Sequence, residues 1–172
     1  AVALSPDAGH EKYMYLSQLL LPEEDGEGGD GAAAVAYSRK GIQLLRQAVQ
    51  NPQEDAESRE ELQAQLCQAL CSLVETLLNL ASAKEASSGG GAAMTEAARE
   101  SEQLLLEAER HQPTSPEPQQ VLASLYVEMG KAEDALRALR KSMSLWYRGS
   151  SGSGEDKMAV DDDDDDGVSA MG

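Results

Sequence analysis

A pair of amphipathic helices joined by a glycine is the feature that most restricts how this chain can fold. The pair lies in "SPEPQQVLASLYVEMGKAEDALRALRKSMSLW", residues 115–146, where apolar residues recur at helical spacing. The first helix is expected to run to about Met129, and Gly130 to supply the turn. The second helix is expected to run from about Ala132 to Trp146. One hairpin buries little apolar surface alone, so it predicts further hairpins that stack on it.

Residues at the two ends of this hairpin indicate where its helices begin and end. Thr114 or Ser115 can cap the first helix, and Pro116 suits its first turn. Glu117 follows Thr114 by three residues, as in a capping box. At the far end, we expect Trp146 to staple the terminal helix rather than to stack on a nucleic-acid base.

The rest of the chain is also predicted to be helical. Helical periodicity recurs in four further segments: 11–21, 32–50, 56–86 and 92–111. The Gly-rich stretches at 22–31 and 87–91 break these segments. Aromatic residues make up only 3% of the chain and Phe is absent, so Ala and Leu must fill the interior, which favours closely packed helices. No apolar run approaches the roughly 20 residues that span a bilayer, so we expect no membrane partner.

Residues 116–147 match the tetratricopeptide repeat (TPR), a helix–turn–helix unit of about 34 residues. Gln119 takes the Trp position of the pattern W-x2-L-G-x2-Y, and Ala123 takes the Gly position. The other positions of the pattern fall on Leu122, Tyr126, Ala135, Leu139 and Ser142. Ala123 and Ala135 are small where two helix backbones approach closely.

Two weaker copies precede this one once insertions are allowed. We therefore predict an all-α fold in which TPR-like hairpins stack into a right-handed superhelix, an α-solenoid, over residues 11–148. The expected hairpins are about 11–50, 56–113 and 114–147. An unrelated bundle rich in Ala and Leu is the alternative.

Both flanks of this domain are predicted to be disordered. Residues 1–10 form the N-terminal flank, and residues 149–172 combine a Gly/Ser linker with six consecutive aspartates. Residues 1–148 carry 23 acidic and 13 basic side chains, a net charge of −10, so the folded part is itself acidic. The acidic tail serves either to capture a partner or only to aid solubility, and its composition does not decide between the two.

The first helices of stacked TPR hairpins line a concave face, and that face is predicted to be polar and acidic. Its expected residues are Glu11, Gln18, Gln68, Ser72, Glu75, Glu117, Gln120, Ser124 and Glu128. The aspartates of the tail, Asp161, Asp162, Asp163, Asp164, Asp165 and Asp166, complete the predicted partner-binding set. No Lys or Arg stands among these positions, whereas TPR clamps for chaperone C-termini need Lys, Arg and Asn there. The predicted partner is a basic protein bound by a monomer, and direct contact with nucleic acid is disfavoured by a net charge of −17.

Catalytic and metal-binding motifs are missing from the sequence. No G-x-S-x-G, P-loop, H-E-x-x-H or G-x-G-x-x-G motif occurs. Cys67 and Cys71 lie one helical turn apart, but neither His10 nor His111 stands at ligand spacing from them, so we expect the cysteines to pack in the core. We therefore expect no enzyme activity, no metal and no cofactor.

Four segments carry a family resemblance: "EKYMYLSQLL", "YSRKGIQLL", "ALCSLVETLL" and "PTSPEPQQVLASLYVEMGKAEDALRALRKSMSLW". Together they resemble the eukaryotic TPR assembly chaperones of large-subunit ribosomal protein L-four. The resemblance implies a protein that binds a newly made ribosomal protein, shields its basic loop and accompanies it from the cytoplasm into the nucleus. It also implies further repeats beyond the Ser-Leu-Trp helix, where this chain has Gly/Ser and Asp instead.

A different function fits the same repeats. Because two of the three copies are generic, a TPR scaffold or co-chaperone adaptor that links proteins in a complex is the alternative. Whether the partner becomes soluble only when this protein is present distinguishes the two.

Overall fold

The computed structural model describes residues 9–21, 29–88 and 91–150. These residues form helices and no strand, which confirms the prediction of an all-α fold. The helices are α1 (Glu11–Leu19), α2 (Gly31–Val49), α3 (Ala56–Ser88), α4 (Ala92–His111), α5 (Glu117–Glu128) and α6 (Ala132–Ser150). The aspartates at 161–166 and the first eight residues lie outside the described residues, so their predicted disorder stays a prediction.

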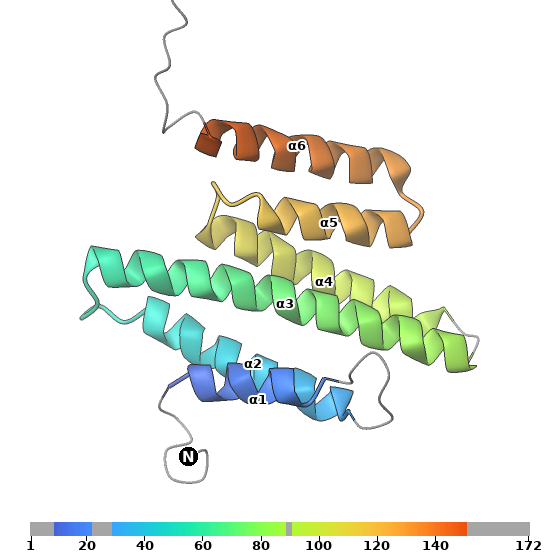
Figure 1. Ribbon diagram of the computed structural model, residues 1–172, viewed down its shortest axis with the longest axis horizontal. Coiled ribbons are helices and arrows are strands. Elements are labelled where there is room, and N and C mark those ends of the chain that lie inside the picture. Colours follow the sequence, from blue (N-terminus) through green and yellow to red (C-terminus); the bar gives the residue numbers. More distant parts are fainter. Residues whose placement is uncertain (1–8, 22–28, 89–90, 151–172) are drawn as a thin grey trace, which may run out of the picture.

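The helices form three antiparallel hairpins that are stacked in chain order, from α1–α2 through α3–α4 to α5–α6 (Figure 1). Helix α3 lies at the centre of the stack, where it contacts α2, α4 and α5. Helix α4 also contacts α5, so the last hairpin rests on both helices of the middle one.

The core is centred on α3, which is apolar on several sides. Leu66, Leu70 and Val74 of this helix are fully buried, and they share one cluster with residues of α2, α4 and α5. Contrary to the expectation from the sequence, the stretch Ala56–Ser87 is long and apolar enough to cross a membrane by length and composition alone, but half of its most apolar window is buried inside the structure. Burial of this extent is typical of the core helix of a helical bundle.

Small residues allow helices of the stack to approach closely. Ala34, Ala98 and Ala108 are almost completely buried, as is Gly41 on α2. A Cβ atom added at Gly41 would lie 2.6 Å from the sulfur of Met14 on α1. The side chain of Met14 on α1 therefore packs into the space that a side chain at Gly41 would need.

The predicted turn at Gly130 is confirmed, and its geometry explains the choice of glycine. Gly130 has φ +68°, and its amide donates to the carbonyl of Val127 at 2.9 Å. The amide of Lys131 donates to the carbonyl of Tyr126 at 2.8 Å. These two bonds form a Schellman motif, in which the left-handed residue is nearly always glycine because it lacks a Cβ atom.

Details at the ends of the last hairpin differ from the sequence-based expectation. The capping box is absent, because Pro116 occupies the cap position and Ser115 Oγ accepts the amide of Glu117 at 3.3 Å. Trp146 does not staple the terminal helix: 63% of it is exposed, and α6 continues past it. Leu139 is likewise 44% exposed, since Ala135, Ala138 and Ser142 form the face of α6 that is buried.

Replacing a central α3 side chain tests whether this helix holds the stack together. Leu70→Ala should lower the free energy of unfolding by roughly 2–5 kcal/mol, because it removes buried apolar surface and leaves a cavity. Gln68→Ala, on an exposed position of the same helix, should change it by less than about 0.5 kcal/mol. Urea unfolding followed by circular dichroism measures both. Equal, small effects in the two variants would contradict a core centred on α3.

Candidate functional site

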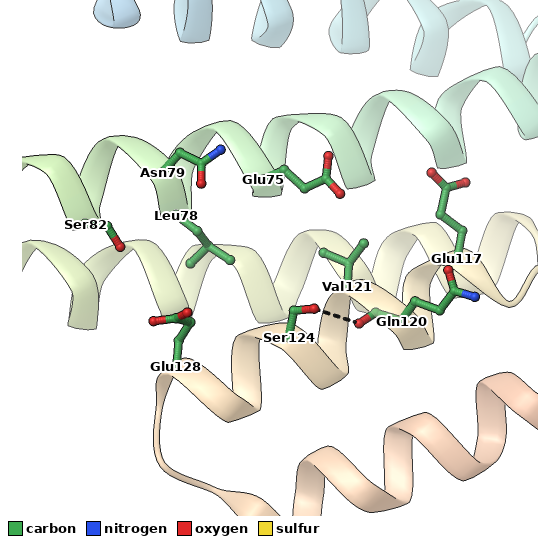
Figure 2. A pocket seen from close by; sticks show the side chains of 9 residues that line it. All are labelled: Glu75, Leu78, Asn79, Ser82, Glu117, Gln120, Val121, Ser124 and Glu128. Carbon is green, nitrogen blue, oxygen red and sulfur yellow. Dashed lines mark hydrogen bonds between the residues drawn. The ribbon is translucent and has the colours of Figure 1, made fainter. Parts of the chain in front are cut away.

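An open groove of about 590 Å³ runs between α3 and α5. Figure 2 shows side chains from both helices directed into the space between them. The α3–α5 groove is lined by Glu75, Leu78, Asn79, Ser82, Glu117, Gln120, Val121, Ser124 and Glu128.

The groove arises from the helical period of two segments that pack side by side. On α3, Glu75, Asn79 and Ser82 are spaced by four and three residues, so they share one face. On α5, Gln120, Ser124 and Glu128 repeat every four residues. The buried residues between these positions turn toward the core, which leaves polar side chains on the groove face.

The structure divides the predicted partner-binding positions between two grooves. Five of the nine helical positions line the α3–α5 groove: Glu75, Glu117, Gln120, Ser124 and Glu128. The other four line a second groove of about 360 Å³, the α1–α3 groove: Glu11, Gln18, Gln68 and Ser72. The two grooves differ in charge, because Glu11 is the only carboxylate residue among those that line the second one. The acidic part of the predicted surface is therefore the α3–α5 groove.

The carboxylates of the α3–α5 groove have no cationic partner in the described part of the chain. None of the residues that line the groove is Lys or Arg. Glu75, Glu117 and Glu128 form no ion pair with any described Lys, Arg or His. The negative charge in the groove is thus left available to a ligand.

Glu117 shows the consequence of this uncompensated charge. It is half-buried at the first turn of α5. Burial raises the pKa of its carboxyl group above the ordinary value, and the nearby negative charge of Glu75 raises it further. A bound cation would relieve both costs.

Basic side chains of the described residues are instead engaged on other surfaces of the stack. Arg46 of α2 makes a bidentate pair with Glu107 of α4, with Nε and Nη2 each 2.7 Å from a carboxylate oxygen. Arg39 pairs with Glu100 of α4 at 2.8 Å, and Lys141 of α6 pairs with Glu109. Three carboxylates of α4, those of Glu100, Glu107 and Glu109, therefore bind cations of the chain itself, whereas those of the groove form no ion pair with a described residue.

The groove also has an apolar component that suits the side chains of lysine and arginine. Leu78 of α3 and Val121 of α5 line it together with the carboxylates. The aliphatic stem of a Lys or Arg can rest on such apolar atoms while its charged head reaches a carboxylate. The groups in the groove are carboxylates, amides and hydroxyls, which bind cations and hydrogen-bond donors.

Four lining residues were absent from the predicted set: Leu78, Asn79, Ser82 and Val121. The signal for Asn79 and Ser82 was present, because they follow Glu75 by four and seven residues on the same helical face. Leu78 and Val121 look like core residues in the sequence. Their access to the groove depends on how α3 and α5 pack, which the period of either helix alone does not determine.

Neutralising Glu117 tests the electrostatic description of the groove. Because the fold raises the pKa of this carboxyl group, its ionised form destabilises the folded state at pH values above that pKa, and the penalty vanishes below the ordinary pKa of Glu. Glu117→Gln should therefore be more stable than the unchanged protein at pH 7, and the difference should close near about pH 4.

Urea unfolding at the two pH values measures this difference. The matched control is Glu128→Gln, at an exposed position of the same groove, which should change stability by less than about 0.5 kcal/mol at pH 7. A Glu117→Gln protein that is less stable than the unchanged one at pH 7 would contradict an uncompensated charge.

Comparison with known proteins identifies a structural neighbour. No family model matches the chain, and no curated protein sequence matches it significantly. Among solved structures, a chain described as the Assembly Chaperone of RpL4 (Acl4), residues 1–338, superposes with a TM-score of 0.61 at 24% sequence identity. The match covers 88% of this chain and 50% of that chain, so this chain spans about half the length of its neighbour. The chain is thus similar in fold to an assembly chaperone of a ribosomal protein.

Proposed function

We propose that this protein is a non-catalytic chaperone that binds and shields a basic ribosomal protein during assembly of the large ribosomal subunit. The observation that carries the proposal is the α3–α5 groove, where Glu75, Glu117 and Glu128 have no cationic partner among the described residues. The similarity in fold to the assembly chaperone of RpL4 supports the choice of client.

The physical basis of shielding is charge neutralisation. Segments that bind ribosomal RNA are rich in Lys and Arg, and before assembly they attract any available nucleic acid. A groove that holds several carboxylates beside apolar atoms offers such a segment both counter-charges and a surface for its aliphatic stems. Binding of this kind is sensitive to salt, since two of the three carboxylates of the groove, those of Glu75 and Glu128, are exposed.

The wider proposal follows the TPR hairpin arrangement. The three hairpins form successive units of a right-handed TPR superhelix, and the α1–α3 and α3–α5 grooves are parts of its concave face. Glu11, Gln18, Gln68 and Ser72 would then contact the same extended client as the acidic groove. In this proposal the protein is a monomer. It binds its client in the cytoplasm and enters the nucleus with it.

A second candidate, a TPR scaffold or adaptor, is favoured by a different surface. Helix α6 exposes an apolar stripe that borders a hollow of about 310 Å³ lined by Leu139, Met143, Trp146 and Tyr147. Contiguous exposed apolar side chains are typical of surfaces that contact other proteins. Expression of the candidate client with and without this protein distinguishes the two functions, because only a shielding chaperone is needed to keep its client soluble.

Reversal of two groove charges tests the proposed binding surface. Glu75→Lys combined with Glu128→Lys replaces attraction by repulsion at two points, and should weaken binding of a Lys/Arg-rich client segment by roughly tenfold or more. Isothermal titration calorimetry at two salt concentrations measures the effect.

The matched control combines Glu96→Lys with Glu133→Lys, which reverses two exposed carboxylates that do not line either groove. The control has the same net charge as the groove variant. A difference in affinity between the two variants therefore reports the position of the reversed charges and not their number. Equal loss of affinity in both variants would show that only net charge matters.

The acidic tail is expected to steer the encounter rather than to hold the client. Deletion of residues 161–166 should lower the association rate constant several-fold and leave the dissociation rate constant nearly unchanged, because charges act on an approaching partner over about 8 Å at physiological salt. Stopped-flow kinetics measures both constants. If the deletion abolishes binding while the groove reversals do not, the tail itself is the binding site.

A further inference from the structure

Two cysteines of α3 and one carboxylate of α5 converge beneath the α3–α5 groove. The sulfur atoms of Cys67 and Cys71 and a carboxylate oxygen of Glu117 all lie within 4.8 Å of one another. Both cysteines are buried and reduced, with 2% and 1% of their surfaces exposed. Fifty residues separate Cys67 from Glu117 in the chain, so only the packing of α5 on α3 brings them together.

The cluster has the donor atoms and dimensions of a metal site. In a tetrahedral zinc site with Zn–S bonds of about 2.3 Å and Zn–O bonds of about 2.0–2.2 Å, the ligand atoms are separated by roughly 3.3–3.8 Å. Closing the present cluster to that size requires side-chain shifts of about 1 Å. Glu117 also lines the open groove, so water can occupy the fourth position.

Core packing alone does not account for the third member of this cluster. Two buried cysteines among leucines behave as small apolar side chains. A half-buried carboxylate beside them, with no ion pair to any described cation, is a cost that the core does not require. A divalent cation would neutralise that carboxylate and give the two sulfur atoms a common partner.

A disulfide fits the same cysteines less well. Residues four apart on a helix have Cβ atoms about 5–6 Å apart, whereas a disulfide needs about 3.5–4.5 Å. Cys67 and Cys71 lie within the continuous helix α3, so a disulfide would distort the central helix of the stack. A metal ion spans the two sulfur atoms without that distortion.

The donor set also selects the metal. Mg²⁺ and Ca²⁺ prefer oxygen ligands, and iron–sulfur clusters need four ligands such as cysteine. Two thiolates with one carboxylate and an open position suit Zn²⁺, which accepts sulfur and oxygen together. We propose that Cys67, Cys71 and Glu117 form a zinc site that links α3 to α5.

The bonds that break and form when Zn²⁺ binds can be stated in full. Two S–H bonds break, two Zn–S bonds form, and the two thiol protons pass to solvent, while the ionised carboxylate of Glu117 supplies the third bond. Because the ligands come from two hairpins, a bound Zn²⁺ should hold the last hairpin against the middle one. This site stands whether or not the groove binds a basic client.

Titration of the reduced full-length protein with Cd²⁺ and with Zn²⁺ tests the site. Cd²⁺ should produce thiolate-to-metal charge-transfer absorption that saturates at one ion per chain. Zn²⁺ in excess should raise the midpoint of thermal unfolding by roughly 5–10 °C. Absence of both responses in protein with two titratable thiols would overturn the proposal.

Three variants separate a built site from loose metal binding to surface acids. Cys71→Ala should lose the charge-transfer absorption and the zinc-dependent rise in unfolding temperature. Glu117→Gln keeps both thiols and should bind Cd²⁺ at least tenfold more weakly, whereas Glu128→Gln, in the same groove, should bind it normally. The unfolding midpoint of each variant without metal shows whether it is folded. An unchanged response in folded Cys71→Ala or Glu117→Gln contradicts the assigned ligands.

Discussion

Burial of α3 against three other helices is the interaction on which the rest of the structure depends. Leu66, Leu70 and Val74 are fully buried where α2, α4 and α5 meet this helix. The first hairpin is thus joined to the middle one through α3, and the last hairpin rests on α3 and α4 together. The same packing leaves one polar face of α3 uncovered, and that face forms a wall of each of the two grooves. Core and candidate site are therefore opposite sides of one helix.

The carboxylates of this stack differ in whether they form ion pairs with other side chains of the chain. Carboxylates of α4, such as Glu100 and Glu107, form ion pairs with arginines of α2. Carboxylates of the α3–α5 groove have no such partner in the described ranges, and burial together with the negative charge of Glu75 raises the pKa of Glu117. An acidic protein can carry surplus charge anywhere on its surface for solubility. Negative charge that is concentrated in a groove beside apolar atoms suits the recognition of a basic polypeptide.

Much of this arrangement could be predicted from the sequence, and the remainder depends on tertiary packing. Helical periodicity and breakers located the helices, and Gly130 located the last turn, because these are local properties. Helical spacing also placed Glu75 and Glu128 on groove-facing positions. The convergence of Cys67 with Glu117 and the exposure of Trp146 could not be predicted, since each depends on which helix lies beside another and in what register.

A footprint of a bound client segment would show whether the α3–α5 groove is its binding surface. Hydrogen–deuterium exchange of the full chain, with and without a saturating Lys/Arg-rich segment of the candidate ribosomal protein, would locate the contact. Binding in the α3–α5 groove should increase protection in residues 72–82 of α3 and 117–128 of α5, with little change in α4. Protection confined to α6 or to the acidic tail, with the groove unchanged, would contradict it.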